Sequence, residues 1–164
     1  MFYYDSSFLA KSSVRYYPGI GKIAECIQTV FINREDKNKE KKAEYMNIIQ
    51  ERQVQAESGE IPPIIIYPEG ATTNGETMVY FNKGAFASLR GVQPIVISYK
   101  SLFPIKAAQD VLGIANHLNL LGMAGYFTGH VIELPVFKPN EYFWKHFWNE
   151  GKEEKWEAFA RVVR

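Results

Sequence analysis

The chain has 164 residues, 46% hydrophobic and 15% aromatic, which is enough apolar material for one domain with a core and too much for a disordered segment. Its 19 Lys and Arg residues and 18 Asp and Glu residues leave a net charge of +1, and no basic stripe with interleaved aromatic residues occurs, which argues against a nucleic-acid partner. The single cysteine, Cys26, excludes an internal disulfide, and its amphipathic and apolar surroundings predict a packed thiol rather than a nucleophile.

The N-terminal residues lack the pattern of a signal peptide. The stretch MFYYDSSFLAKSSVRYYPG contains no basic region followed by an uninterrupted apolar run. The run nearest to a membrane span, VLGIANHLNLLGMAGYF at residues 111–127, is interrupted by polar residues and falls short of the ~18 apolar residues that a span requires. We therefore expect a chain that does not cross a bilayer by itself, although it can lie on one.

In chain order, the first predicted element is a strand over residues 27–32, IQTVFI, which is rich in β-branched residues. A helix is then predicted from Asp36, as its cap, to about Glu57, because this stretch is full of helix formers. Its apolar stripe is thin, so we expect the helix on the surface. Gly59 and the pair Pro62-Pro63 end it.

The stretch IIIYPEGATTNGETMVYFNKGAF, residues 64–86, contains the second predicted strand at 64–67 and a loop at 69–77. A short extended piece follows and turns at Gly84. The strand is followed by Pro68-Glu69-Gly70, which places a carboxylate and a flexible backbone at the C-terminal end of an apolar strand. Strand ends of this kind often carry the chemistry of α/β proteins.

The remaining predicted elements are a third strand at 92–99, a helix over about 110–125, a fourth strand at 129–137 and a C-terminal amphipathic helix in KEEKWEAFARVVR. Short strands that alternate with helices predict an α/β domain with a mixed, largely parallel sheet flanked by helices. The aromatic stretch NEYFWKHFW leaves two interpretations open. It is either an interfacial anchor, with Lys145 near lipid head groups, or a helix end that contacts the core or a partner.

Two strand ends release groups that suit a phosphorylated ligand. Arg34 follows the first strand and Glu69 the second, and the ends of parallel strands meet at one sheet edge. An arginine offers a rigid fork of donors to phosphate, and Gly70 lets backbone N–H groups approach an anion. The alternative is a solvated turn at Arg34 and a plain loop start at Glu69.

The three histidines are not predicted to bind metal or to activate a nucleophile. His117, His130 and His146 have no Cys, His or acid at a zinc-ligand spacing, and the chain contains no G-x-S-x-G motif.

Four sequence features together resemble the glycerolipid acyltransferases. GKIAECIQTVFINR resembles the family's second block, a strand that ends in arginine, and YPEGATTN resembles its third block, E-G-[TA] after [FY]-P. FNKGAF resembles the segment after that block, and VQPIVI resembles the fourth block, an apolar strand with a central proline. The motif EGATTN together with VQP is most similar to the lysophosphatidylcholine acyltransferase branch.

The resemblance implies an enzyme of phospholipid synthesis or remodelling. It implies acyl-CoA as the donor substrate, a lysophospholipid as the acceptor, and neither metal nor cofactor. Arg34, Glu69 and Gly70 are implied in binding the acceptor phosphate, with Thr72 and Lys83 as further candidates near them. Amphiphilic substrates imply work at a membrane surface, at the cytosolic face of the endoplasmic reticulum or another internal membrane.

The family's first block, H-x-x-x-x-D, which supplies the general base and the residue that orients it, has no match. Gly122, Pro135 and Gly151 stand five residues after the three histidines. We therefore expect residues 1–164 to form a single acyltransferase-like domain that is incomplete at its N-terminus and inactive alone. The alternative is a non-catalytic acyltransferase-like subunit with a structural or lipid-binding role and a possible protein partner.

Overall fold

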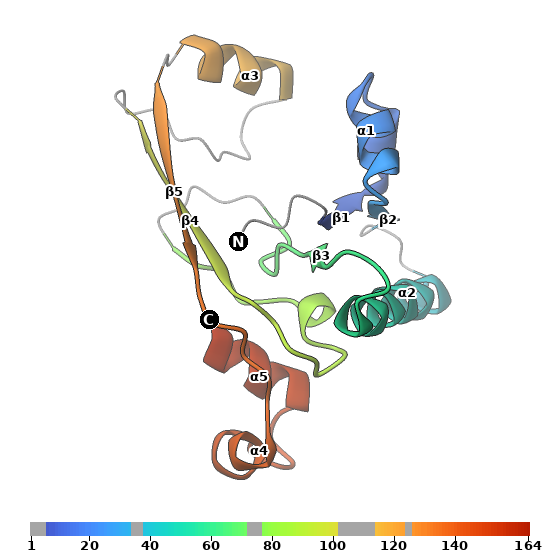
Figure 1. The fold of residues 1–164 in the computed structure, drawn as a ribbon, viewed down its shortest axis with the longest axis vertical. Helices are drawn as coiled ribbons and strands as arrows, with labels where there is room; N and C mark the ends of the chain where they lie inside the picture. Colours follow the sequence, from blue (N-terminus) through green and yellow to red (C-terminus); the bar gives the residue numbers. More distant parts are fainter. Residues whose placement is uncertain (1–5, 34–37, 72–76, 102–113, 124–125) are drawn as a thin grey trace.

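The computed structural model describes residues 6–33, 38–71, 77–101, 114–123 and 126–164 (Figure 1). Three short parallel strands form the first sheet, in the order β2-β1-β3. They are β1 (Ser7–Lys11), β2 (Val30–Ile32) and β3 (Ile64–Ile65). Leu9 of β1 lies opposite Val30, and Ser7 lies opposite Ile64. This parallel sheet confirms the predicted α/β class, although the central strand β1 was not predicted.

Helices make both connections between the parallel strands, as parallel pairing requires. The 3-10 helix η1 (Ser12–Tyr16) and the helix α1 (Ile20–Cys26) connect β1 to β2, and α2 (Lys39–Ser58) connects β2 to β3. α1 and α2 flank the sheet (Figure 1). A small core of Leu9, Val30 and Ile49 attaches α2 to the strands.

α2 confirms the predicted surface helix, since Ile49 is its one buried residue. Its cap is Asn38, whose side chain accepts a hydrogen bond from the Glu40 amide at 2.9 Å. Asp36, the predicted cap, lies outside the described residues. The helix ends at Gly59, which adopts the left-handed conformation with φ +81°.

The predicted first strand is shorter than expected, because Ile27 caps α1 and Gln28 has a φ of +56°. The prediction of a packed Cys26 thiol is wrong. Cys26 is exposed at the end of α1, whose buried residues are the small Gly21 and Ala24. The helix therefore approaches its neighbours through small residues, and its larger side chains stay at the surface.

A second sheet is an antiparallel pair, β4 (Ile95–Ser101) and β5 (Phe127–Glu133), with α3 (Ile114–Met123) between them in the chain. An isolated bridge joins Val92 to Phe137. The third and fourth predicted strands thus exist, but they pair with each other instead of extending the parallel sheet. The predicted helix over 110–125 corresponds to α3 within the described residues.

The larger core is formed by residues of the C-terminal helices α4 (Glu141–Phe147) and α5 (Lys155–Val163) and by the residue that follows the 3-10 helix η2 (Lys83–Ala85). It consists of Phe86, Phe143, Phe159 and Ala160, with ring centroids of Phe86 and Phe159 5.2 Å apart. α5 confirms the predicted amphipathic helix, and Glu154 forms a capping box at its start. No helix in the described part of the chain is long and apolar enough to cross a membrane.

The aromatic stretch forms α4 and divides between core and surface. Phe143 is 4% exposed and Trp144 packs against the core, whereas Tyr142 is 65% and Phe147 45% exposed. The interpretation of a helix end packed on the core therefore holds for Phe143 and Trp144.

Candidate functional site

The loop after β3 makes a tight turn at the predicted site. The Gly70 amide donates to the Tyr67 carbonyl oxygen at 3.2 Å, so Pro68 and Glu69 occupy the two central positions. Proline suits the first central position and glycine the fourth position of such a turn. Gly70 has a φ of +72°, a conformation that costs residues with a Cβ extra energy.

Glu69 joins this turn to the segment at residues 78–82. Its carboxylate oxygen Oε2 accepts a hydrogen bond from the Val79 amide at 3.3 Å, and its carbonyl oxygen accepts one from the Asn82 Nδ2 at 3.0 Å. The Asn82 amide donates to the Pro68 carbonyl oxygen at 2.7 Å. One hydrogen bond thus holds the carboxylate of the half-buried Glu69, and two more hold the backbone of the turn next to the glycine. Sequence reasoning missed Val79 and Asn82, because no local pattern marks these contacts.

Lys83, the first residue of η2, directs its ammonium toward α5. Its Nζ lies 2.8 Å from a carboxylate oxygen of Glu154 and 5.9 Å from the ring centroid of Trp156. The hydrogen bond from Lys83, with a second one from the Trp156 indole, holds the pKa of the Glu154 carboxyl below its usual value. The described contacts of the Lys83 ammonium are therefore with α5.

Arg34 and Thr72, the other two predicted site residues, lie outside the described residues. The sheet topology shows where the two strands that precede the predicted residues end. β2 and β3 both run parallel to β1, one on each side, so their C-terminal ends point to the same edge of the sheet. Ile32 is the last residue of β2, two positions before Arg34, and Ile65 is the last residue of β3, four positions before Glu69. The chain therefore leaves both strands in the same direction.

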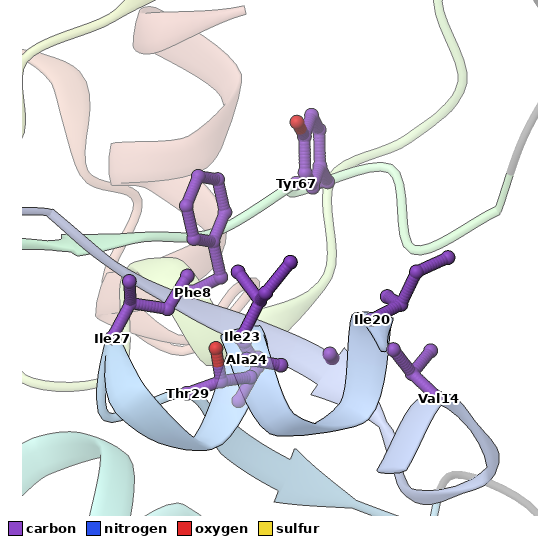
Figure 2. Close-up of a pocket in the computed structure, with 10 residues that line it drawn as sticks. Phe8, Val14, Ile20, Ile23, Ala24, Ile27, Thr29 and Tyr67 are labelled. Carbon is purple, nitrogen blue, oxygen red and sulfur yellow. The ribbon is translucent and has the colours of Figure 1, made fainter. Parts of the chain in front are cut away.

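An apolar groove lies between β1 and α1 and reaches Tyr67, just before the turn (Figure 2). Its volume is about 250 Å³. No charged side chain lines it. The lining residues are Phe8, Leu9, Ala10, Val14, Ile20, Ile23, Ala24, Ile27, Thr29 and Tyr67. This groove was not predicted from the sequence, although Ile20, Ile23 and Ile27 have the spacing of one helical face.

His130 and His146 take no part in this arrangement. His130 lies in β5 opposite Ser98, and the ring of His146 is tilted by 40° against that of Tyr142, with the two ring centroids 4.3 Å apart. Among the residues that the structure describes, no three His, Cys, Asp or Glu side chains gather as a metal site.

Comparison with known proteins finds one matching family model and several similar proteins. A family model described as Acyltransferase matches residues 3–101. Lysophospholipid acyltransferase LPEAT1 of Arabidopsis thaliana is 34% identical over 136 residues, which cover 82% of this chain and 34% of that protein. Lysophosphatidylcholine acyltransferase 1 of Homo sapiens is 35% identical over 138 residues, or 83% of this chain and 25% of that protein. The chain thus spans about a third or less of these relatives, and no solved structure matches it.

Proposed function

The chain belongs to the acyltransferase family, and from this premise we propose that it carries the acceptor-binding part of an enzyme that transfers an acyl group from acyl-CoA to the free hydroxyl of a lysophospholipid. The observation that carries the proposal is the turn Tyr67–Gly70 at the end of a parallel strand, with the Glu69 carboxylate held in place. The printed names of the relatives support the class of acceptor.

In this proposal each site residue has a separate role toward the acceptor. The Arg34 guanidinium donates paired hydrogen bonds to the phosphate, for which its planar fork is suited. The backbone at Gly70 approaches the phosphate closely, and Glu69 orients the arginine or a hydroxyl of the ligand. Thr72 and Lys83 contribute further donors near the phosphate.

The groove in Figure 2 provides the apolar surface that an amphiphilic substrate requires. A lysophospholipid combines a charged head with a hydrocarbon chain, and burial of that chain contributes about 0.8 kcal/mol per methylene. We assign the groove to the hydrocarbon chain because its lining is uncharged and its end at Tyr67 adjoins the proposed phosphate site. A charged peptide or nucleotide would find no partner for its charges along this surface.

Acyl transfer requires a proton acceptor that this chain does not supply in the family's form. The acceptor oxygen forms an ester bond with the acyl carbon, the carbon–sulfur bond breaks, the hydroxyl proton passes to a base and the CoA sulfur takes a proton. No histidine here has an aspartate five positions later. Since loss of a general base commonly costs a factor of ~10²–10⁴ in rate, we propose that the chain alone has little or no turnover.

The second candidate is a non-catalytic acyltransferase-like subunit that binds lipid or has a structural role, with a protein partner. Under both candidates the chain works at a membrane surface, because its ligands are amphiphiles. We place it at the cytosolic face of the endoplasmic reticulum or another internal membrane. Acyl-CoA is the donor substrate, and no metal or bound cofactor is required.

A titration of the purified chain with lysophosphatidate, monitored by calorimetry and combined with an assay of CoA release from acyl-CoA, tests the proposal. Arg34→Ala should weaken binding by about tenfold or more, since hydrogen bonds to charged groups contribute about 1.5–3 kcal/mol. Arg90→Ala is the matched control, because the Arg90 guanidinium pairs with Glu57 on the surface. Unchanged affinity in Arg34→Ala would remove Arg34 from the site. Rapid CoA release by the chain alone would contradict the predicted lack of a base, and binding that ignores the phosphate would favour the second candidate.

A further inference from the structure

The segment at residues 78–83 contacts both the turn at Glu69 and the two ends of α5. Val79 and Asn82 in this segment make the hydrogen bonds that fix Glu69. Two residues outside the segment hold its two ends. The Arg164 Nη2 donates to the Met78 carbonyl oxygen at 2.9 Å, and Glu154 accepts a hydrogen bond from Lys83 at 2.8 Å.

The contact at Arg164 has a second component. Its guanidinium carbon lies 4.5 Å from the ring centroid of Tyr80, which suits a cation–π interaction. Tyr80 is 82% exposed and Met78 46% exposed, so little other protein surrounds this end of the segment. The arginine is therefore a main determinant of where residues 78–80 lie.

The segment is long enough to run along α5. An extended chain from Met78 to Lys83 spans about 17 Å, and a helix from Glu154 to Arg164 spans about 15 Å. The segment runs antiparallel to α5, since its first residue meets the end of the helix and its last residue meets the start. Between these ends Phe81 stacks on Phe86, which follows the segment and packs on Phe159 of α5.

We propose that Arg164 and Glu154 are positioning residues for the acceptor site, which hold residues 78–83 where Val79 and Asn82 can fix Glu69. The proposal rests on the proposed function of the turn at Glu69 and Gly70. It extends the site to α5, which lies beyond the residues 3–101 that the family model matches. In this arrangement Lys83 binds Glu154, and its contact with the ligand is an additional one.

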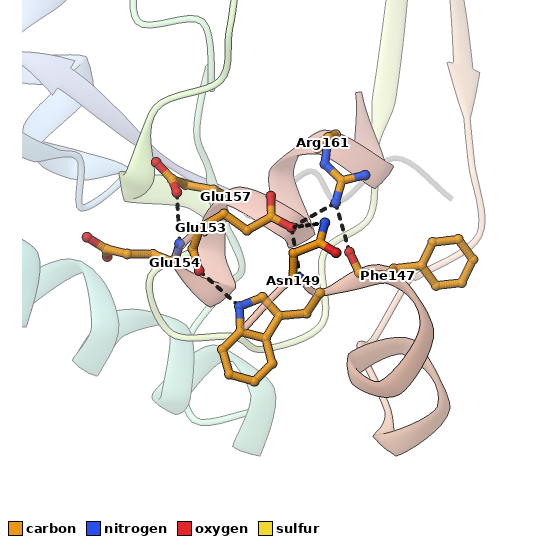
Figure 3. Close-up of polar contacts among 7 residues, drawn as sticks. Phe147, Asn149, Glu153, Glu154, Glu157 and Arg161 are labelled. Atoms are coloured by element: carbon orange, nitrogen blue, oxygen red, sulfur yellow. Dashed lines mark hydrogen bonds and ion pairs between the residues drawn. The ribbon is translucent and has the colours of Figure 1, made fainter. Parts of the chain in front are cut away.

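Arg161, within α5, provides a matched control for Arg164, which is the C-cap of that helix. Arg161 belongs to the polar network between α4 and α5 (Figure 3), where its Nη2 donates to the Phe147 carbonyl oxygen at 2.8 Å and to Glu153 at 3.0 Å. These bonds stabilise the turn between the helices, and the Asn149 side chain also donates to Glu153. Arg161→Ala therefore removes an arginine and its hydrogen bonds from the same helix without removing a contact to residues 78–83.

The first measurement is hydrogen exchange at the Val79 amide. Arg164→Ala should accelerate it about three- to tenfold, the effect of losing one net hydrogen bond. Arg161→Ala should leave it within about twofold of the unmodified chain. Arg164→Lys should restore part of the protection, because an ammonium can donate to the Met78 carbonyl oxygen. Unchanged exchange in Arg164→Ala, or an equal acceleration in Arg161→Ala, would overturn the positioning role.

The second measurement separates positioning from general stability. Affinity for lysophosphatidate should fall about three- to tenfold in Arg164→Ala, whereas affinity for a monoacylglycerol with the same hydrocarbon chain should not change, since it has no phosphate. An equal loss for both ligands would overturn the role at the phosphate site. If the unmodified chain does not bind lysophosphatidate, the proposed function fails, while the exchange at Val79 still tests the contact with α5.

Discussion

The substitution Gly70→Ala tests the turn at the candidate site most directly. Gly70 has a φ of +72°, where a residue with a Cβ costs about 1–2 kcal/mol more than glycine. The turn is half-buried and is held mainly by the hydrogen bonds of residues 67–70 and 79–82, so it has room to relax away from this conformation. A ligand that needs the native turn must then restore it, and its affinity should fall by a factor of about 5–30.

Gly59→Ala is the control for this prediction. Gly59 ends α2 with a φ of +81°, and a Cβ built there meets no atom within 4 Å, so the substitution introduces the backbone penalty alone. We expect the melting temperature to fall by about 2–8 °C, as a loss of 1–2 kcal/mol implies for a chain of this size. Affinity for lysophosphatidate should stay unchanged.

The assay is a calorimetric titration with lysophosphatidate, preceded by thermal unfolding of each variant. Equal affinities of Gly70→Ala and the unmodified chain would show that the ligand does not use the native turn. Equal losses of affinity in Gly70→Ala and Gly59→Ala would show that the effect follows from stability and not from the site.

Phe159→Ala should lower the free energy of unfolding by about 3–5 kcal/mol in a urea titration, because the side chain is 0% exposed among aromatic rings, and a loss below about 1 kcal/mol would contradict this packing. The Lys83 hydrogen bond holds the pKa of the Glu154 carboxyl below its usual value. The contribution of this contact to stability is therefore complete above the usual pKa of a glutamate and is lost as the pH falls through the lowered pKa; Glu154→Gln should flatten the acid limb of a stability–pH profile. Ile23→Ser, in the groove, should weaken binding of lysophosphatidate, whereas Val54→Ser, an exposed position on α2, should not.

Elements with a long local pattern could be predicted from the sequence, and elements that depend on distant pairing could not. α2 and α5 follow from helix formers and periodicity over many residues. β1, the central strand, is only five residues long and has the sequence SFLAK, with a serine and a lysine at its ends. Its conformation depends on pairing with β2 and β3, which arrive later in the chain. No property of these five residues alone indicates that pairing.

The same distinction applies to the candidate site. Glu69 and Gly70 stand at the end of an apolar run, which local reasoning can recognise, and the resemblance to a family selects them further. The residues that hold them are separated in sequence. Val79 lies 10 residues from Glu69, and Arg164 lies 86 residues from Met78, the residue whose carbonyl it binds. Such contacts are decided by the packing of whole elements and leave no periodic signal.

The candidate site connects the two hydrophobic cores of the chain, because in the sequence it follows the residues of one core and precedes those of the other. The turn at Glu69 follows β3, which belongs to the core of Leu9, Val30 and Ile49. The segment that holds Glu69 leads through Phe81 to Phe86, in the core with Phe159. Three hydrogen bonds between the turn and this segment therefore connect the parallel sheet to the C-terminal helices. Because the family match ends at residue 101, the last residue of β4, the matched residues include the turn but not the helix that holds its partner segment. Loosening of the C-terminal core should thus reach the phosphate site through residues 78–83 without any change in the residues that contact the ligand.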